Sequence, residues 1–211
     1  MIIGNGLIAK KCKSIDGEDV IIFASGVSNS SETDIREYDR ETNLLLDQDK
    51  NKRLIYFSTC SIFDTNYTGE KYIQHKLNTE TLIKNEFKKY SIFRLPNVVG
   101  KSNNKHTLFN YITNKIQNEE EIVTFRNCFR YLLDVKDLWW IIRNNLKNDI
   151  INVTLDDPIE VVYLIKRMAA CLNKTANIRL ENKNDKKYTV STKLNKICGY
   201  NNSVIEKYYK G

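Results

Sequence analysis

Short apolar runs alternate along the chain with longer segments of helical period. The runs are rich in Ile and Phe, and each is followed by polar residues or glycine, which is typical of strands buried on both faces. They lie at residues 1–3, 20–25, 54–59 and 90–95. Between them, residues 32–48 and 70–89 carry apolar side chains at three- and four-residue spacings, as expected for helices. This order predicts a parallel α/β sheet covered by helices.

The second half of the chain continues with a helical pattern at residues 107–116, a short strand at 121–125 and a helix at 135–146. A further helix is predicted to begin at Asp156 to Pro158 and to extend to Cys171, because proline fits an early helical position. No internal repeat, low-complexity tract or Pro/Gly-rich linker interrupts the sequence. The pattern therefore predicts a mixture of helices and short strands after the first four strands.

The length of the chain and its lack of linkers predict one compact domain over residues 1–211. With 211 residues and 41% hydrophobic content, the chain can bury one sizeable core. We expect residues 1 to about 100 to form the main sheet. Residues from about 101 to 211 would complete the core and form a small lid over the sheet.

The chain is basic, with 33 Lys and Arg against 26 Asp and Glu and a net charge of +7. Such a charge suits the phosphates of a nucleotide, a phosphosugar or a nucleic acid. The basic residues are spread through the chain and interrupted by glutamates, so a solvated cationic surface explains them equally well. A nucleic-acid-binding module rests only on this charge and on the many tyrosines, and we do not expect it.

The five cysteines show neither CxxC spacing nor an even count, and only two histidines accompany them. A metal site is therefore not expected, and the cysteines point to a reducing compartment. No stretch approaches the ~20 apolar residues of a membrane span, and the N-terminal apolar run is too short for a signal peptide. We expect a soluble cytoplasmic protein.

A glycine-containing loop, GNGLIA from Gly4 to Ala9, directly follows the first strand. Small residues there let the backbone turn sharply and bring backbone N–H groups close to a pyrophosphate. Taken alone, the GxGxxA pattern also occurs by chance. Its place between a strand and a helix favours a nucleotide loop.

Two more clusters follow the predicted strands. ASGVSNS, residues 24–30, supplies small residues, and STCSIFD, residues 58–64, supplies hydroxyls. Ligands of open parallel sheets bind beyond the carboxyl ends of the strands, where such hydroxyls can hydrogen-bond a reacting carbonyl or alcohol. In the alternative interpretation, residues 24–30 are an ordinary loop and the hydroxyls only satisfy the end of a strand.

Tyr72 and Lys76 stand four residues apart and share one face of the helix predicted at residues 70–89. A cation beside a phenol favours the phenolate, which makes the phenol a better acid or base near neutrality. YxxxK also arises by chance in a chain rich in both residues, and it would then be a solvated helix surface. The choice depends on the surrounding residues.

Together these segments resemble the extended short-chain dehydrogenase/reductase family, particularly its nucleotide-sugar epimerases, dehydratases and reductases. The resemblance covers nearly the whole chain. Its motifs are GNGLIA, FASGVSN (23–29), STCSIFD, YIQHKLNTE (72–80), IFRLPNVVG (92–100), FRYLLDVKDL (129–138), INVTLDD (151–157) and YTVSTKLNKICGY (188–200). The resemblance implies a Rossmann-like, doubly wound sheet and an NAD(P)-dependent epimerase or keto-reductase for a nucleotide-linked sugar, in the synthesis of cell-surface polysaccharide precursors.

By the same resemblance, Thr59 is the catalytic hydroxyl, Tyr72 the acid/base and Lys76 the residue that binds the nicotinamide ribose and lowers the pKa of the tyrosine. The implied cofactor-binding residues are Gly4, Asn5, Gly6, Leu7, Ile8, Ala24, Ser25, Gly26, Ser58, Tyr72, Lys76 and Pro96. The implied substrate-binding residues are Ser61, Asn97 and Arg130. A bidentate arginine suits a nucleotide diphosphate, and the alternative for Arg130 is a surface ion pair.

The sequence departs from the family pattern at the reaction centre that the resemblance implies. Dehydratases of the family carry an acidic pair after the catalytic hydroxyl, where this chain has Cys60 and Ser61. Dehydration is therefore disfavoured relative to epimerisation or keto reduction. Only about a dozen residues separate Thr59 from Tyr72, which indicates a trimmed substrate loop.

The largest departure lies between the Gly loop and the strand at residues 20–25. At roughly 3.3 Å per strand residue and 1.5 Å per helical residue, residues 10–19 can finish one helix and return but cannot form the family's usual second and third strands. We expect a narrower sheet with its first strand near an edge. The lost segment includes the acidic residue by which the family selects NAD. Lys10, Lys11 or Lys13 could instead face the 2′-phosphate of NADP, so we slightly favour NADP over NAD as the cofactor.

Two further possibilities follow from these departures. A non-catalytic descendant that keeps the fold as a binding or regulatory protein is the alternative to an enzyme. The resemblance also implies a possible homodimer through the helices that flank the sheet, including residues 70–89, and an open edge strand is a second reason to associate.

Overall fold

The computed structural model describes residues 1–13, 17–66, 69–102, 104, 107–182 and 187–209, and these form two compact units. Unit 1 comprises Met1–Ile62, Tyr67–Leu95 and Val135–Val153. Unit 2 comprises Phe63–Asn66, Pro96–Asp134 and Thr154–Gly211. Each unit is described by itself, and a single compact domain stays a prediction.

Unit 1 is built on a parallel sheet of five strands in the order β1-β2-β3-β4-β9. The strands are β1 (Ile2–Ile3), β2 (Val20–Phe23), β3 (Arg53–Thr59), β4 (Lys89–Leu95) and β9 (Ile150–Asn152). The first four coincide with the four apolar runs of the sequence. The side chains of β2 and β3 are almost all buried, because helices cover both faces of the sheet.

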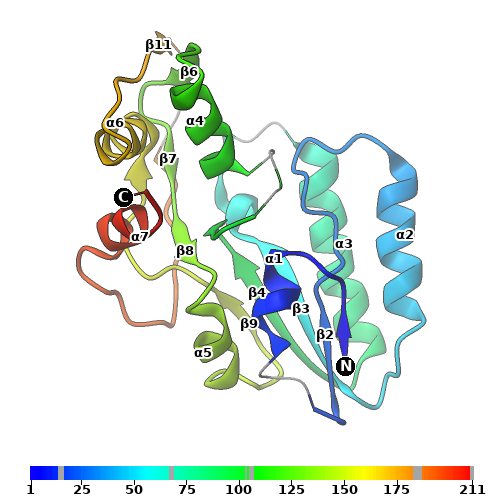
Figure 1. Cartoon of the computed structure of the whole chain (residues 1–211). Helices are drawn as coiled ribbons and strands as arrows, with labels where there is room; N and C mark the ends of the chain where they lie inside the picture. Colours follow the sequence, from blue (N-terminus) through cyan, green and yellow to red (C-terminus); the bar gives the residue numbers. More distant parts are fainter. Residues whose placement is uncertain (14–16, 67–68, 103, 105–106, 183–186, 210–211) are drawn as a thin grey trace. The chain divides into compact units, whose positions relative to one another are not determined.

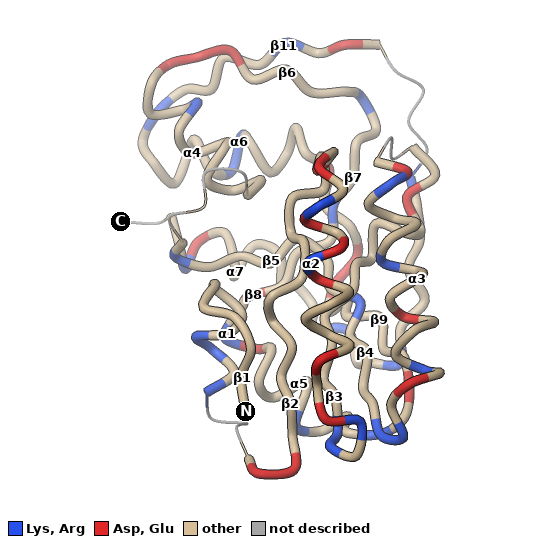
Figure 2. Tube along the Cα trace, turned by 90° about the vertical axis from the view of Figure 1, so that its right-hand side faces the viewer, with Lys and Arg blue, Asp and Glu red and all other residues tan. Residues whose placement is uncertain are grey.

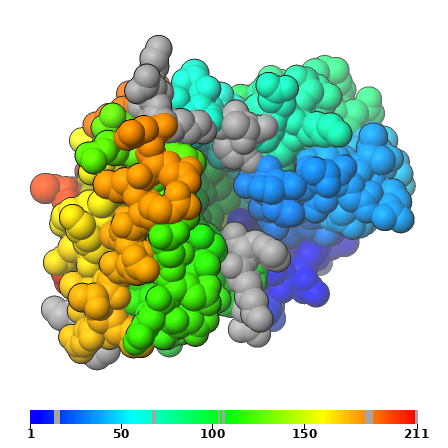
Figure 3. All heavy atoms as spheres, turned by 90° about the horizontal axis from the view of Figure 1, so that it is seen from above, coloured from blue at the N-terminus to red at the C-terminus, as the bar shows by residue number. Residues whose placement is uncertain are grey.

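The helices of unit 1 are α1 (Leu7–Lys11), α2 (Ile35–Leu46), α3 (Glu70–Glu86) and α5 (Leu138–Arg143), with a 3-10 turn at Cys60–Phe63. Figure 1 shows α2 and α3 side by side on one face of the sheet, with α1 and α5 on the other. Spheres of α2 and α3 touch in the view from above (Figure 3). The prediction of a doubly wound, Rossmann-like sheet is confirmed for unit 1.

Strand β1 pairs directly with β2, in the register Ile2↔Ile22 and Ile3↔Phe23. It is therefore the edge strand of the described sheet. The prediction of a narrowed sheet whose first strand lies at an edge is confirmed, since the described residues between β1 and β2 contain helix α1 and no further strand of the sheet.

The described residues of unit 2 form three helices and three pairs of short strands. The helices are α4 (Leu108–Gln117), α6 (Val161–Cys171) and α7 (Tyr200–Tyr209). The strand pairs are β5 (Asn97–Val99) with β8 (Leu132–Asp134), β6 (Ile122–Phe125) with β11 (Ile178–Glu181), and β7 (Phe129–Arg130) with β10 (Ile159–Glu160). Buried Asp134 anchors α7, because its carboxylate accepts hydrogen bonds from Lys207 and Tyr208.

The predicted start of the helix at Asp156 to Pro158 is wrong. Ile159 and Glu160 form β10, which pairs antiparallel with β7, and α6 begins only at Val161. The backbone N–H of Val161 donates to Cys128 O at 2.8 Å, so pairing with a distant segment determines where the helix begins. Proline's preference for an early helical position is too weak to compete with this pairing.

Charges on the two helices of unit 1 that lie side by side are mixed. Figure 2 shows basic and acidic positions alternating along α2 and α3. A basic stripe on these helices, which nucleic-acid binding would favour, is therefore not formed. Among the helices of the described residues, none combines the length and apolar character that a membrane crossing requires.

Candidate active site

The loop after β1 is shaped by Gly4. Its φ of +114° lies in the region that only glycine adopts readily, and a Cβ there would lie 2.4 Å from the carbonyl oxygen of Ala24. Gly4 thus lets the loop approach the end of β2 closely. Gly4, Asn5 and Gly6 are exposed, while Leu7 and Ile8 are half-buried at the start of α1.

Helix α1 has only five residues, so few peptide dipoles align toward the loop. A Cβ at Gly6 would meet nothing within 4 Å, which means that packing does not require glycine there. Lys10, Lys11 and Lys13 are all exposed. The exposed backbone of residues 4–6 and these cations are the features of this loop that suit a phosphate.

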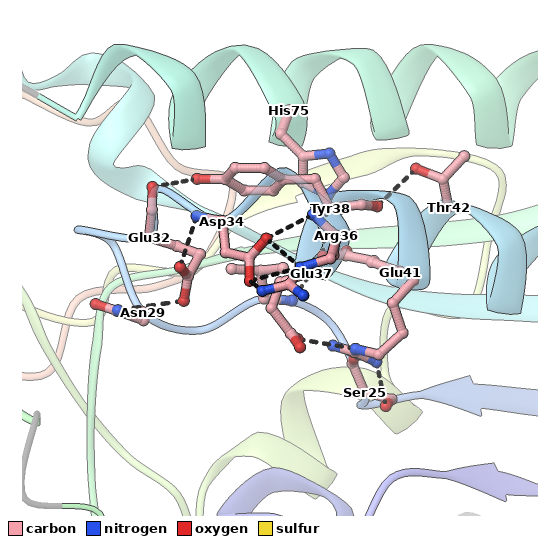
Figure 4. A network of polar contacts seen from close by, with 12 residues as sticks. Ser25, Asn29, Glu32, Asp34, Arg36, Glu37, Tyr38, Glu41, Thr42 and His75 are labelled. Carbon is pink, nitrogen blue, oxygen red and sulfur yellow. Dashed lines mark hydrogen bonds and ion pairs between the residues drawn. The ribbon is translucent and has the colours of Figure 1, made fainter.

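At the end of β2, the half-buried residues Ala24, Ser25 and Gly26 are held by helix α2. Arg40 Nη1 donates to Ser25 O at 3.1 Å and to Ser25 Oγ at 3.3 Å, and Figure 4 draws the contacts at Ser25. A Cβ at Gly26 would lie 2.8 Å from Glu41 Oε1 and 3.0 Å from Lys76 Nζ. The backbone at Gly26 therefore runs directly over an ion pair.

The hydroxyls at the end of β3 have partners within unit 1. Ser58 Oγ donates to Glu80 Oε1 at 2.6 Å, and Glu80 in turn accepts two hydrogen bonds from Arg94 at 2.9 and 2.6 Å. Thr59 Oγ1 accepts the backbone N–H of Ser61 at 3.0 Å. These contacts match the alternative in which the hydroxyls satisfy the end of a strand, and the roles of Ser58, Thr59 and Ser61 toward ligands stay predictions.

Cys60 occupies the position where dehydratases of the resembling family carry an acid. Its thiol is buried, donates to Arg94 O at 3.1 Å, and burial raises its pKa to about 12. Such a thiol does not exchange protons near neutrality. That dehydration is disfavoured stays a prediction.

Tyr72 and Lys76 lie together on α3, as their spacing predicts. Both are buried, with 8% and 2% of their surface exposed, and the Lys76 Nζ lies 5.7 Å from the centre of the Tyr72 ring. Tyr72 packs in a cluster with Val27 and Tyr38. They are therefore not a solvated helix surface.

The ammonium of Lys76 is directed at two other residues. It lies 3.0 Å from Glu41 Oε1, 3.3 Å from Glu41 Oε2 and 3.1 Å from the Tyr56 hydroxyl. An ammonium group has three N–H donors, so these contacts match all of them. The predicted contact between Lys76 and a ribose would require one of them to be exchanged.

Glu41 is the residue of this cluster that the sequence pattern did not single out. It has no exposed surface, and its carboxylate also faces the backbone N–H of Val27 at 2.6 Å and His75 Nε2 at 3.0 Å. Burial acts to raise the pKa of Glu41, but His75, Lys76, Tyr56 and Val27 outweigh it and lower the pKa to about 2. Glu41 is therefore a buried carboxylate anion.

A signal for Glu41 was present in the sequence. Tyr38, Glu41 and Leu45 fall on the same face of α2 and are all buried, so a charged residue occupies a core position. Lys76 occupies the equivalent kind of position on α3. His75 reaches from α3 toward α2, as Figure 4 shows, and its ring centre lies 4.7 Å from that of Tyr38.

The remaining predicted residues belong to unit 2. Pro96 precedes β5, and Asn97 donates its backbone N–H and its side-chain amide to Tyr131 O at 3.1 and 3.3 Å. Arg130 Nη1 lies 3.3 Å from Asp64 Oδ2; this is an ion pair, as in the alternative interpretation, but Asp64 is only 6% exposed, so the pair is partly buried and not at the surface. Their predicted cofactor and substrate contacts stay predictions.

Comparison with known proteins shows the fold through solved structures. No protein-family model matches the sequence, and neither does any curated protein. The chain is similar to dTDP-glucose 4,6-dehydratase of Bacillus anthracis str. Ames in complex with NAD, with a TM-score of 0.62 and 15% identity over 82% of this chain and 64% of that one. It thus spans less than two thirds of that enzyme's length.

Two further structures cover more of the chain. UDP-N-acetylglucosamine 4-epimerase of Methanobrevibacter ruminantium M1, in complex with UDP-N-acetylmuramic acid, has a TM-score of 0.64 and 14% identity over 99% of this chain and 81% of that one. RMD of Pseudomonas aeruginosa, complexed with NADPH, has a TM-score of 0.66 and 14% identity over 91% and 80%. The shared feature is the fold. The predicted resemblance is confirmed at that level.

Proposed function

We propose that the chain is an NAD(P)-dependent enzyme that epimerises or reduces a nucleotide-linked sugar, with Tyr72 as its acid/base. The observation that carries the proposal is the buried ammonium of Lys76 at 5.7 Å from the Tyr72 ring, on a fold shared with a dTDP-glucose dehydratase solved with NAD and with RMD solved with NADPH. A cytoplasmic location and a role in polysaccharide precursor synthesis go with this proposal.

Proton transfer is the part of the reaction that we assign to the chain's own side chains. A phenol titrates near ~10, and a cation beside it stabilises the phenolate, so Tyr72 next to Lys76 can take and return the proton of a sugar hydroxyl nearer neutrality. Thr59 would hydrogen-bond the same oxygen. The nicotinamide cofactor, when bound, supplies or accepts the hydride.

The residues proposed to hold the cofactor fit it in part. The exposed backbone of residues 4–6, drawn against Ala24 by Gly4, suits a pyrophosphate. The narrow sheet provides no strand beyond β1 to line an adenine pocket among the described residues. We therefore propose weak cofactor binding, with NADP favoured over NAD because Lys10, Lys11 and Lys13 are exposed.

The substrate contacts and a homodimer are the least supported parts of the proposal. Ser61, Asn97 and Arg130 are proposed to bind the nucleotide sugar, with Arg130 exchanging its Asp64 partner for a diphosphate, since guanidinium binds both anions in the same bidentate manner. The proposed homodimer would pair two copies through α2 and α3.

Calorimetric titration with NADH and NADPH tests the proposal. We expect binding of at least one, with NADPH the tighter, and loss of binding in Gly4→Val, whose side chain would be forced against the Ala24 carbonyl. A matched control is Gly17→Val, since a Cβ at Gly17 meets nothing within 4 Å. A folded protein that binds neither cofactor, nor a panel of UDP- and dTDP-sugars, would contradict the proposal.

A non-catalytic binding or regulatory protein is the second candidate. The contacts of Lys76 favour this candidate. Its three N–H donors already face Glu41 and Tyr56, whereas an enzyme of the proposed kind would need a donor of Lys76 for the cofactor ribose. Cofactor binding without turnover over a panel of nucleotide sugars would support this candidate over the enzyme.

A further inference from the structure

We propose, on the basis of the proposed function, that Glu41 is a positioning residue that fixes Lys76 as a buried positive charge beside Tyr72. In this arrangement Lys76 acts on the tyrosine through its charge and does not bind the cofactor ribose. Glu41 lies on α2, and its carboxylate contacts Lys76, Val27, Tyr56 and His75. It acts only through the lysine.

The geometry of the Glu41–Lys76 pair supports this role. Both side chains are almost fully buried, and the ammonium faces both carboxylate oxygens, at 3.0 and 3.3 Å. The Tyr56 hydroxyl, on β3, donates to Glu41 Oε1 at 2.6 Å and lies 3.1 Å from the ammonium, so a residue of the sheet contacts both members of the pair. The long lysine side chain is thereby held in one position.

The carboxylate is itself fixed from two elements. Oε2 accepts the backbone N–H of Val27, which follows β2, and faces His75 on α3. Gly26 leaves room for the pair only because it has no side chain. A carboxylate with this many partners is rigid, which is what a positioning group requires.

Burial makes the charge of Lys76 depend on Glu41. An ammonium taken out of water without a partner loses its proton easily, and fully buried lysines titrate as low as ~5–6. Burial lowers the pKa of Lys76, whereas the charge and hydrogen bond of Glu41 raise it. Without the carboxylate, the pKa of Lys76 would fall, and the lysine would stabilise a phenolate less well.

Other charged groups around Lys76 do not replace Glu41. Glu80, on α3, raises the pKa of Lys76 through its charge and is engaged by Arg94, while Arg40 on α2 lowers it. The remaining titratable groups that face the pair are Tyr56 from β3 and Tyr72 and His75 from α3. Glu41 is the carboxylate in contact with the ammonium.

The test is the titration of the Lys76 ammonium by NMR of protein labelled with 15N-lysine, its signal assigned by its absence in Lys76→Met. In the unaltered protein we expect Lys76 to stay charged through pH 7. In Glu41→Gln, which keeps the shape of the side chain but removes its charge, we expect the pKa of Lys76 to fall by about 1–3 units. The control is Asp39→Asn on the exposed face of α2, which should leave the titration unchanged.

The outcomes separate this inference from the proposed function. A neutral Lys76 at pH 7 in the unaltered protein, or equal titration of Lys76 in Glu41→Gln and the unaltered protein, overturns the inference whether or not a cofactor binds. If Glu41→Gln does not fold, the titration of the unaltered protein alone decides. Failure to bind NADH or NADPH overturns the proposed function and leaves the NMR result standing.

Turnover supplies a second readout that a merely structural role would not move. If the charge of Lys76 is what matters, kcat/KM of Glu41→Gln should recover toward the value of the unaltered protein as the pH is lowered through the new pKa of the lysine. A uniform loss at every pH, with the NMR titration unchanged, would mean that Glu41 only supports the fold.

Discussion

Removing one partner of the Glu41–Lys76 pair should destabilise unit 1 far more than its position on a helix would imply. At the observed 3.0 Å and an effective dielectric constant of about 20, the attraction is about 5–6 kcal/mol. Desolvation of the two ions offsets most of this, so the intact pair contributes little net stability. A single substitution, however, leaves an unpaired buried charge.

We therefore expect Glu41→Gln and Lys76→Met each to lower the free energy of unfolding by about 3–5 kcal/mol. The double variant leaves no buried charge at this place, so its loss should fall short of the sum of the two by about 2 kcal/mol or more. For a chain of this length, the single variants should melt about 6–20 °C lower.

Urea unfolding followed by tryptophan fluorescence measures the free energy of unfolding of unit 1. Trp139 and Trp140 are the two tryptophans of the chain and both lie on α5 in unit 1. Asp39→Asn is the matched control, and it should stay within about 0.5 kcal/mol of the unaltered protein. Strict additivity of the two single losses would refute the reasoning, because it would mean that the two charges do not interact.

Four further outcomes follow from the structure. Tyr72→Phe should abolish turnover in an activity assay while circular dichroism shows an intact fold; full activity would exclude Tyr72 as the acid/base. Gly4→Ala should cost at least about 2 kcal/mol in urea unfolding, because it combines a φ of +114° with a 2.4 Å contact to Ala24 O. The pKa of Glu41 is about 2 in the folded protein and near ~4.3 in the unfolded chain. This difference contributes up to about 3 kcal/mol of stability, which is present above pH ~4.3 and is lost as the pH falls toward 2. Urea midpoints that do not fall over that pH range would contradict this. The Cys60 thiol, with its pKa raised to about 12, should react with a thiol reagent at pH 8 only after unfolding, as mapped by mass spectrometry.

The sequence predicts the architecture of unit 1 well because its strands are continuous apolar runs between amphipathic helices. Strands β1 to β4 and helices α2 and α3 depend on local patterns of this kind. The short strand pairs of unit 2 do not, since two-residue strands such as β7 and β10 are defined by the partner they meet and carry no period of their own. The displaced start of α6 has the same cause.

The candidate site was predictable where a backbone conformation or a helical spacing demands particular residues. Gly4 is required by its φ, and Tyr72 and Lys76 share a helix face because they are four residues apart. The contact between Lys76 and Glu41 joins residues 35 positions apart on two helices, and only the packing of α2 against α3 brings them together. Charged residues on core faces were the available signal, and a single sequence does not say which of them pair.

The edge position of β1 ties ligand binding to local unfolding. Two residues of backbone pairing, Ile2 with Ile22 and Ile3 with Phe23, attach the first strand to the rest of the sheet. So small an attachment opens at far lower free energy than β3, which is paired on both sides, and its amides should exchange hydrogen much faster. Because Gly4 follows this strand, any ligand held by the loop stabilises the N-terminal segment as it binds, and part of its binding free energy is spent on that ordering. Protection of the amides of residues 2–10 from hydrogen exchange would then report ligand binding at the loop, even for a ligand that gives no product and no spectroscopic change.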